Sequence, residues 1–515
     1  MTMDRMLLGD ILQRNAQDPG LMHKKAIIFG SRELTYGNLN EQCNRVANGL
    51  RDLGVRKGDR IGVLSRNSDT YVTVYFALAK LGAIMVPVNF WYRSREVHYT
   101  LRQSGVRGLI FHRRFAEVVA GVGSLSNLEW TLTIGDHSGN RLEELAAGSP
   151  ADEPGVELDE NDPHIILYTS GTTGFPKGAV FSHKSHYLQA LSLARSTGGH
   201  SGDVGLVVYP LFHTGGPDCL VLPHFLMGAT LVILDGADPD AILSAAARHR
   251  ATNIFCVPTV WRWILARQRR SNYDVTSIQR CLGSSDTFPT ALLKDILAAF
   301  ESDVYVTYGL TEAGCILTVC RLTSSDLGKL GSVGRPMAPV ELDVVDSSGN
   351  PVATGEVGEV VAKTAFAMLE YWNMPEKTVE ALKGGWLYTG DLGRIDNDGY
   401  LYLSGRAKDM IVSGGENIYP LEIERLLKEN PKIRDAAVVG IPDREWGESV
   451  LAAVVASDGA DLTADEVSNY VRARLAGFKK PRWVEIIPEF PVTTATGKVR
   501  KAVLRERYRE KYGTA

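Results

Sequence analysis

One loop of the chain combines small hydroxyl residues, glycines and a lysine in a pattern that suits phosphate binding. Residues 168–178 read YTSGTTGFPKG and follow an apolar, strand-like stretch at 164–167. The backbone N–H groups of such a loop can face a polyanion, and Lys177 adds a point charge. The loop predicts a site for the β- and γ-phosphates of a nucleotide, with a flexible surface turn as the alternative. It is not a P-loop, because Gly178 stands where a Ser or Thr is needed.

A second segment, 308–312, reads YGLTE and follows the strand-like stretch 304–307. The carboxylate of Glu312, at the end of a strand, suits a Mg²⁺ ion beside phosphates. Tyr308 is placed to stack on a base. A helix that starts at Thr311 is the alternative interpretation of this segment.

Two further segments carry an aspartate and a lysine. Asp391, in the run YTGD, offers two acceptor oxygens that suit the two hydroxyls of a ribose, and Arg406 follows it along the chain. Lys498 ends the stretch PVTTATGK, and a lysine on such a loop in a separate domain can enter and leave a site. Taken alone, Asp391 also fits an ordinary turn, and a Gly-Lys pair carries little information.

These segments need a framework, and the hydrophobic pattern predicts an α/β one. Stretches with helical spacing alternate with short apolar stretches typical of buried strands. Strands separated by helices indicate parallel sheets. The expected helices lie at 41–54, 70–81 and 238–249, and the expected strands at 60–64, 83–88, 204–210, 229–234 and 252–257.

The pattern changes toward the C-terminus. From about 330 to 404, short alternating strands are split by glycine-bearing turns, which indicates a mainly β subdomain. The chain is therefore predicted to contain an N-terminal domain at 1–404, a hinge at 405–410 and a small, mobile α+β domain at 411–515 with its own core. In that last domain we expect helices at 420–429 and 463–475 and strands at 434–440, 449–456 and 482–487.

Composition excludes several classes of protein. The 515 residues include 56 Lys and Arg and 60 Asp and Glu, a formal charge of −4, which gives no support for nucleic-acid binding. The six cysteines form no CxxC pair, so we expect buried, reduced thiols and a cytoplasmic protein. The N-terminus lacks the features of a signal peptide, and no apolar run is long enough for a transmembrane helix.

The four chemical segments, in this order and at these separations, resemble the adenylate-forming superfamily. That superfamily includes acyl- and aryl-CoA synthetases, peptide-synthetase adenylation domains and firefly luciferase. The resemblance covers nearly the whole chain and also includes the runs LTY at 34–36, PLFH at 210–213, GSVGRP at 331–336 and GGENI at 414–418. The runs FHTGG at 212–216 and PDREWGE at 442–448 are most similar to those of bacterial medium- or long-chain fatty acyl and aryl acid–CoA ligases.

The resemblance implies a role for each matching residue. Thr311 and Glu312 would bind the α-phosphate of ATP and Mg²⁺, and Lys498 would bridge the acid's carboxylate and the α-phosphate during adenylation. Asp391 and Arg406 would hold the ribose. The adenine site would include Gly283, Ser284, Ser285, Tyr308 and Gly309. The phosphate loop would comprise Thr169, Ser170, Gly171, Thr172, Thr173, Gly174 and Lys177.

The second half-reaction of the family uses the thiol of coenzyme A, and further residues match it. Lys408 matches the hinge about which the small domain rotates between half-reactions. That rotation would bring Gly414 and Gly415 to the site to shape a pantetheine tunnel, and a CoA phosphate could dock near Trp446. His213 matches a gating position, with a core histidine bonded to backbone as the alternative, while Gly215 and Gly216 would leave room for a long or ring-bearing acid.

The expected activity is ATP- and Mg²⁺-dependent conversion of a carboxylic acid to acyl-AMP and pyrophosphate, then transfer of the acyl group to CoA with release of AMP. Adenylation alone, or transfer to the phosphopantetheine of a carrier protein, is the near alternative. An ATP phosphotransferase or a nucleotide-binding regulator is a less favoured alternative, because neither function explains the C-terminal domain. Asp286 departs from the family pattern and adds a charge near the expected adenine and acyl wall, where it would alter the choice of substrate. A helix N-cap ahead of 290–299 is the alternative interpretation. Relatives occur as monomers and dimers.

Overall fold

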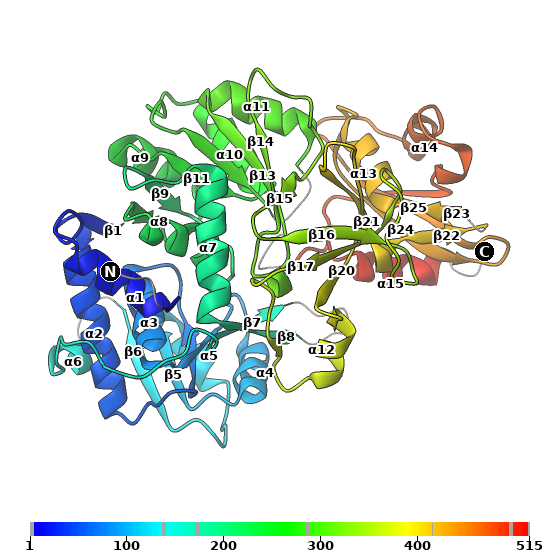
Figure 1. The fold of residues 1–515 in the computed structure, drawn as a ribbon. Helices are drawn as coiled ribbons and strands as arrows, with labels where there is room; N and C mark the ends of the chain where they lie inside the picture. The colour runs from blue at the N-terminus through cyan, green and yellow to red at the C-terminus, as the bar shows by residue number, and fades with distance from the viewer. Residues whose placement is uncertain are drawn as a thin grey trace. The chain divides into compact units, whose positions relative to one another are not determined.

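The computed structural model describes residues 5–135, 141–169, 176–284, 288–414, 416–493 and 498–512 (Figure 1). Contacts within the chain group it into two compact units. The first comprises residues 1–330, 334–341 and 362–387, and the second comprises residues 331–333, 342–361 and 388–515. The strand β21 (Leu401–Arg406) thus belongs to the same unit as the C-terminal residues. A boundary at 404 with a hinge at 405–410 stays a prediction.

The first unit contains a nine-stranded sheet whose central strands are parallel. The outer strands at both ends run antiparallel to their neighbours, so the antiparallel pairs formed by the described residues of this sheet lie at its two edges. The strand order is β15 (Arg335–Pro336), β14 (Thr318–Leu322), β13 (Asp303–Tyr308), β12 (Arg280–Gly283), β11 (Asn253–Cys256), β9 (Val204–Val207), β10 (Thr230–Ile233), β1 (Lys25–Phe29) and β2 (Arg32–Thr35).

A second sheet of the first unit has seven strands. Five of them form a parallel set, and two antiparallel strands extend it at one edge. The order is β18 (Glu370–Tyr371), β8 (Lys177–Ser182), β7 (Pro163–Thr169), β4 (Ile84–Pro87), β3 (Arg60–Leu64), β5 (Gly108–His112) and β6 (Trp130–Ile134).

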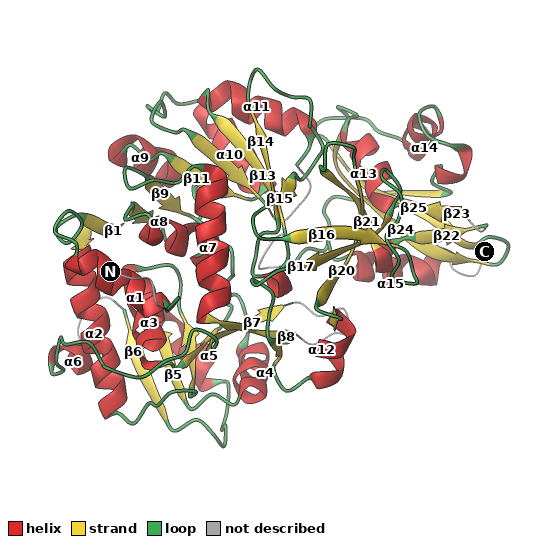
Figure 2. Ribbon diagram, viewed as in Figure 1, coloured by secondary structure: helices red, strands yellow, loops and turns green. Residues whose placement is uncertain are grey.

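Helices connect and cover these strands, as expected for crossover connections between parallel strands. Figure 2 shows the long helix α7 (His183–Thr197). It begins where Ser182 accepts a hydrogen bond from the Ser185 amide and ends at Gly198, which has the left-handed conformation. The other helices of the first unit are α1 (Leu8–Gln17), α2 (Tyr36–Asp52), α3 (Asp69–Leu81), α4 (Ser94–Ser104), α5 (Ala116–Ala120), α6 (Arg141–Ala147), α8 (Leu222–Leu226), α9 (Pro239–His249), α10 (Pro258–Gln268), α11 (Thr290–Phe300) and α12 (Pro375–Ala381).

Most of the second unit is built on two five-stranded sheets, although β19 and the end residues of β16, β17 and β20 are grouped with the first unit. In one, the order is β16 (Glu341–Val345), β17 (Gly358–Lys363), β20 (Trp386–Ile395) and β19 (Leu382–Lys383), with β21 beside β20. In the other, the order is β23 (Glu416–Ile418), β22 (Ile411–Ser413), β25 (Gly447–Ala456) and β24 (Ile433–Asp443), with β26 (Trp483–Ile486) beside β25.

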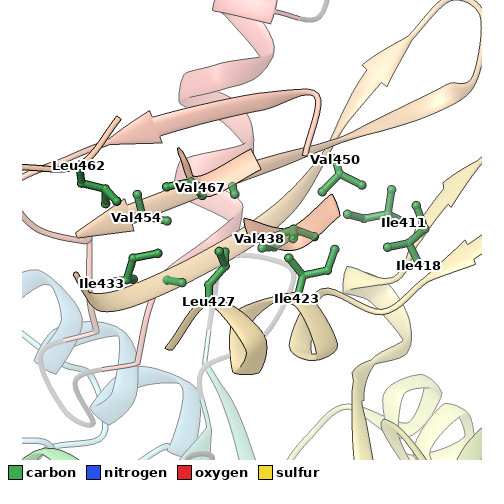
Figure 3. Close-up of a cluster of buried hydrophobic side chains, with 13 residues drawn as sticks. Ile411, Ile418, Ile423, Leu427, Ile433, Val438, Val450, Val454, Leu462 and Val467 are labelled. Carbon is green, nitrogen blue, oxygen red and sulfur yellow. The ribbon is translucent and has the colours of Figure 1, made fainter. Parts of the chain in front are cut away.

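The sheet of β22 to β26 carries a hydrophobic layer on each face. Alternate residues of β24 and β25 point to opposite sides, because strand side chains alternate. Val438 and Val454 join a cluster with α13 (Pro420–Lys428) and α14 (Ala464–Arg472), as Figure 3 shows. Val439 joins a second cluster with α15 (Lys501–Tyr512). The C-terminal hundred residues therefore have an α+β core of their own.

The α/β prediction is confirmed, with parallel sheets in the large N-terminal part and a smaller α+β domain at the C-terminus. All six cysteines are described, and all are buried as free thiols. No helix in the described part of the chain has the length and apolar character needed to cross a bilayer.

Candidate active site

The segment that carries Thr311 and Glu312 is a tight turn at the carboxyl end of β13. In parallel α/β sheets ligands bind at this end of the strands. A short 3₁₀ turn, Thr311–Ala313, follows β13, and the Cys315 amide then donates to the Leu310 carbonyl at 3.2 Å. A side chain at Gly309 would overlap the Cys315 carbonyl group, so glycine is needed for the chain to fold back here.

The carboxylate of Glu312 is the centre of a polar cluster. Its Oε1 atom accepts a hydrogen bond from the Thr169 hydroxyl at 3.4 Å and another from the Tyr371 hydroxyl at 2.7 Å. The ammonium group of Lys177 lies 4.0 Å from the centre of the Tyr371 ring. The structure therefore brings together the two ends of the phosphate-loop segment and the predicted metal-binding glutamate.

Burial changes the protonation behaviour of two members of this cluster. The pKa of Lys177 lies below the ordinary lysine value, because burial disfavours the charged form more strongly than Glu312 favours it. The pKa of Tyr371 lies far above the ordinary tyrosine value, first because of burial and then because of the charge of Glu312. Tyr371 therefore remains a hydrogen-bond donor throughout the working pH range.

The donor set fits a nucleotide-bound Mg²⁺ ion. Mg²⁺ prefers oxygen ligands and is commonly held by one or two carboxylates together with substrate phosphates. Glu312 supplies the carboxylate, and Thr169 adds a hydroxyl at the same place. Among the described residues, no group of three or more His, Cys, Asp or Glu side chains is arranged to hold a metal ion without a substrate.

The predicted adenine residues lie at the carboxyl ends of the adjacent strands β12 and β13. The Ser284 hydroxyl donates to the Thr307 carbonyl at 3.3 Å, and the Thr307 hydroxyl donates to the Gly283 carbonyl at 3.1 Å. These bonds fix the two strand ends to each other. Tyr308 is only 6% exposed.

His213 lies in the loop that follows β9. Its Nδ1 atom accepts a hydrogen bond from the Gly215 amide at 3.1 Å, which leaves the other ring nitrogen to carry the proton in the neutral form. The ring lies 5.3 Å from that of Tyr209. This backbone contact is the one expected of a structural histidine, and the gating role stays a prediction.

The expectation that Gly215 and Gly216 leave room for the acid is wrong for this structure. A Cβ atom on Gly216 would lie 2.7 Å from the Pro210 carbonyl oxygen and 2.8 Å from the Leu211 Cα atom. A Cβ atom on Gly215 would lie 2.9 Å from the Tyr209 ring. Both glycines are there because the loop packs tightly on itself.

In the second unit, Asp391 and Arg406 are directly opposite each other on β20 and β21. The Arg406 Nε atom lies 2.7 Å from Asp391 Oδ1. The aspartate side chain is 9% exposed and the arginine side chain 43% exposed. The structure therefore brings the two predicted ribose residues together, with the arginine orienting the carboxylate.

The other described residues predicted in this unit fall into three places. Gly414, with φ +58°, donates its amide to the Trp446 carbonyl at 2.8 Å, and Trp446 is 48% exposed. The Lys498 amide donates to the Thr493 hydroxyl at 3.2 Å. Lys408 lies in the 3₁₀ turn Ala407–Asp409, where burial lowers its pKa although Asp409 opposes this effect.

Some predicted residues lie outside the described part of the chain. They are Ser170, Gly171, Thr172, Thr173, Gly174, Ser285 and Gly415, together with Asp286. One residue of the cluster, Tyr371, was not predicted. It lies on a two-residue strand with no periodic pattern, so only its pairing with β8 reveals it.

Comparison with known proteins extends over both units. The sequence profile of the family of AMP-binding enzymes matches residues 12–372, and that of the AMP-binding enzyme C-terminal domain matches residues 422–498. The chain is 37% identical to a feruloyl-CoA synthase of an Amycolatopsis species, over 94% of this chain and 96% of that protein. It is 36% identical to the long-chain-fatty-acid–CoA ligase FadD13 of Mycobacterium tuberculosis, over 92% and 93% of the two chains.

A solved structure agrees with this similarity. The anthranilate CoA ligase AuaEII in complex with anthranoyl-AMP superimposes with a TM-score of 0.90 at 31% identity, covering 98% of this chain and 97% of that one. Another relative, at 33% identity over 94% of this chain and 93% of its own, is ScoC of Streptomyces coeruleorubidus, a fatty acid–[acyl-carrier-protein] ligase.

Proposed function

The chain belongs to the family of AMP-binding enzymes, and from this premise we propose which of its residues perform each step of an acid–CoA ligase reaction. The protein is an AMP-forming acid–thiol ligase. It activates a carboxylic acid with ATP to give acyl-AMP and pyrophosphate, and then transfers the acyl group to the thiol of CoA with release of AMP. The observation that carries the residue assignment is the convergence of Thr169, Lys177 and Glu312 in one cluster.

The first half-reaction has to bring two anions together. A carboxylate oxygen attacks the α-phosphorus of ATP, and the bond from that phosphorus to pyrophosphate breaks. Cations and N–H donors placed where charge develops lower the barrier, and positioning provides much of the remainder. We assign phosphate binding to Lys177 and the loop that precedes it, and α-phosphate binding to Thr311. When bound, Mg²⁺ held by Glu312 would neutralise phosphate charge.

The remaining assignments follow the family pattern. Lys498 is assigned to the carboxylate and the α-phosphate. Asp391 is assigned to the ribose hydroxyls, and its pairing with Arg406 supports this because the pair fixes the direction of the carboxylate. The adenine is assigned to Gly283, Ser284, Tyr308 and Gly309.

For the thiol step, we assign the gate to His213 and the hinge to Lys408. We assign the pantetheine passage to Gly414 and the site for the nucleotide end of CoA to Trp446.

The acid is proposed to be an aryl or a medium- to long-chain fatty acid. The activities of the relatives support both types, since one is a feruloyl-CoA synthase and another is a long-chain-fatty-acid–CoA ligase. CoA is the proposed acceptor. ScoC supports a carrier protein as the second candidate. A cytoplasmic location and a monomeric or homodimeric state belong to this proposal as well.

The test is pyrophosphate release from MgATP across a panel of fatty, aryl and polycyclic acids, each with and without CoA. We expect release that depends on the acid and that turns over faster with CoA, with AMP as the nucleotide product. Release of about one equivalent per enzyme, unaffected by CoA, would indicate that a carrier protein or another partner is the acceptor, or that the reaction stops at acyl-AMP. Formation of ADP in place of AMP would contradict the ligase assignment.

A further inference from the structure

We propose that Tyr371 is a positioning residue of the adenylation site, which fixes the Glu312 carboxylate and the Lys177 ammonium group relative to each other. This proposal rests on the proposed function, because it assigns Glu312 to Mg²⁺ and Lys177 to the ATP phosphates. No chemical step passes through the tyrosine itself. Its contribution is to hold both charged groups in place before the substrates bind.

A single side chain makes both contacts. The Tyr371 hydroxyl donates to Glu312 Oε1 at 2.7 Å, and the face of the same ring lies 4.0 Å from the Lys177 ammonium nitrogen. The tyrosine is only 3% exposed. Since it has few rotatable bonds and little space, a displacement of either charged group would strain the other contact.

The contact with Glu312 orients its carboxylate. The hydroxyls of Tyr371 and Thr169 both donate to Oε1, the first at 2.7 Å and the second at 3.4 Å. Both donors are directed at Oε1, so Oε2 is the oxygen that would be available to a cation. Hydrogen bonds to the ligand of a metal ion commonly set both its direction and its basicity.

The contact with Lys177 has a different effect. A ring face attracts an ammonium ion through its quadrupole and does not neutralise it, whereas a carboxylate partner would compete with phosphate for the charge. The ring can therefore hold Lys177 in position and leave its three N–H donors able to reach phosphate oxygens. A phenylalanine would preserve this contact but not the one with Glu312.

Backbone pairing places the tyrosine. Tyr371 lies opposite Ala179 in the antiparallel pair of β18 and β8, two residues from Lys177. The Trp372 amide donates to the Gly178 carbonyl at 2.7 Å, and the Met368 amide donates to the Glu312 carbonyl at 2.9 Å. The segment 368–372, which includes β18, thus joins the lysine segment to the glutamate segment, and Tyr371 lies between these bonds.

The test compares Tyr371→Phe and Tyr371→Leu with the wild type. The primary readout is Mn²⁺ binding in the presence of a non-hydrolysable ATP analogue, measured by EPR of the free ion. We expect Tyr371→Phe to weaken Mn²⁺ binding about tenfold and to leave the affinity for the nucleotide within about twofold. Tyr371→Leu should weaken Mn²⁺ binding equally and lower the nucleotide affinity severalfold as well, because the ring contact is also lost.

A matched control is available in Tyr273→Phe. The Tyr273 hydroxyl donates to the carboxylate of Asp240 at 2.8 Å, so this variant removes a phenol–carboxylate bond of the same kind among residues to which no site role is assigned. It should bind Mn²⁺ and nucleotide like the wild type. Equal losses in Tyr273→Phe and Tyr371→Phe would identify a general structural effect and overturn the proposal.

Two outcomes separate this inference from the function on which it rests. Mn²⁺ binding that is unchanged in Tyr371→Phe would overturn the positioning role, whatever acid the enzyme uses. The expected loss of Mn²⁺ binding, in an enzyme that releases no pyrophosphate with any acid of the panel, would support the positioning role and contradict the proposed substrate class.

Discussion

At the scale of single residues, we expect the proposed adenylation site to depend most on the charge of Glu312. It accepts two hydroxyl donors on one oxygen, and it raises the pKa of Lys177 against the effect of burial. A carboxylate surrounded in this way is suited to a cation and to phosphates rather than to proton transfer. This carboxylate and the neighbouring Lys177 ammonium group lead to two predictions.

Glu312→Gln should lower acid-dependent pyrophosphate release by about 100-fold or more, because an amide binds Mg²⁺ far less well than a carboxylate. The measurement is the initial rate across a Mg²⁺ titration, with the melting temperature as a check on folding. Glu370→Gln, which changes an exposed glutamate of β18, is the control and should behave like the wild type. A rate for Glu312→Gln within a few-fold of the wild type would remove Glu312 from the metal site.

Lys177 gives a prediction about pH. Burial holds its pKa below the ordinary lysine value. The phosphate contact that we propose for Lys177 needs the protonated form. Activity that needs this form is present below the pKa of Lys177 and is lost as the pH rises through it, by about tenfold per pH unit. kcat/KM for MgATP should therefore fall at a lower pH than an ordinary lysine would give.

Lys177→Arg tests whether Lys177 is the group whose deprotonation causes the fall of kcat/KM at high pH, the alkaline limb of the pH profile. An arginine stays charged over the whole range, so the limb should move to higher pH even where the maximal rate is reduced. An unchanged limb in this variant would mean that another group titrates. In Glu312→Gln the limb should move the other way, because the carboxylate that favours the charged lysine is gone.

At the scale of elements, the site depends on turns at the carboxyl ends of strands. The turn after β13 requires Gly309, since any Cβ atom there would overlap the backbone of Cys315. Gly309→Ala should lower the free energy of unfolding by about 1–3 kcal/mol and move Thr311 and Glu312 enough to reduce adenylation. Calorimetry and pyrophosphate release measure the two effects.

Gly477→Ala is the control for that prediction, because a Cβ atom at Gly477 would meet nothing within 4 Å. It should leave both stability and activity unchanged. A melting temperature for Gly309→Ala equal to that of the wild type would show that the turn can relax, and that the glycine is not required by the backbone.

Local pattern predicted many of these elements well. The strand expected at 60–64 is β3 (Arg60–Leu64), and the helix expected at 420–429 is α13 (Pro420–Lys428). Apolar spacing and the proline at the start of a helix are visible within a few residues of sequence. The helix expected at 41–54 instead begins at Tyr36, because the Thr35 side chain caps it by accepting from the Asn38 amide.

Non-local packing could not be predicted in this way. Tyr371 belongs to the site only because β18 pairs with β8, a contact between segments almost two hundred residues apart. The loop after β9 looked open in sequence because it contains Gly215 and Gly216, yet backbone and ring atoms fill the space beside them. The type of each predicted residue indicated its chemistry, whereas the residues that contact it depend on the fold and could not be predicted from local sequence.

At the scale of the whole molecule, the assigned residues are divided between the two compact units. Thr169, Lys177 and Glu312 belong to the first unit, whereas Asp391 and Lys498 belong to the second. The second unit also has its own hydrophobic layers around the sheet of β22 to β26. The proposed hinge lies inside the second unit, between the sheet that includes β20 and β21 and the sheet of β22 to β26. A change of a few backbone torsions there would move Lys498 and leave Asp391 in place, which would allow one enzyme to run two half-reactions.

Lys408 is the position proposed to absorb that change. It lies in the 3₁₀ turn Ala407–Asp409, immediately after β21 and before β22. Proline at this position would fix φ near −65° and remove the freedom that a hinge needs. Lys408→Pro should therefore slow thioester formation by about tenfold or more, while the rate of acyl-AMP formation without CoA stays within about twofold of the wild type.

Lys408→Ala separates the backbone from the side chain. It removes the half-buried ammonium group, whose pKa burial lowers, but it leaves the backbone free to rotate. We expect Lys408→Ala to retain both half-reactions, measured as pyrophosphate release without CoA and acyl-CoA formation with it. An equal loss of both half-reactions in Lys408→Pro would mean that the defect comes from folding. The same selective loss in Lys408→Ala as in Lys408→Pro would mean that the defect comes from the lost charge of the lysine. Either outcome would place the hinge elsewhere.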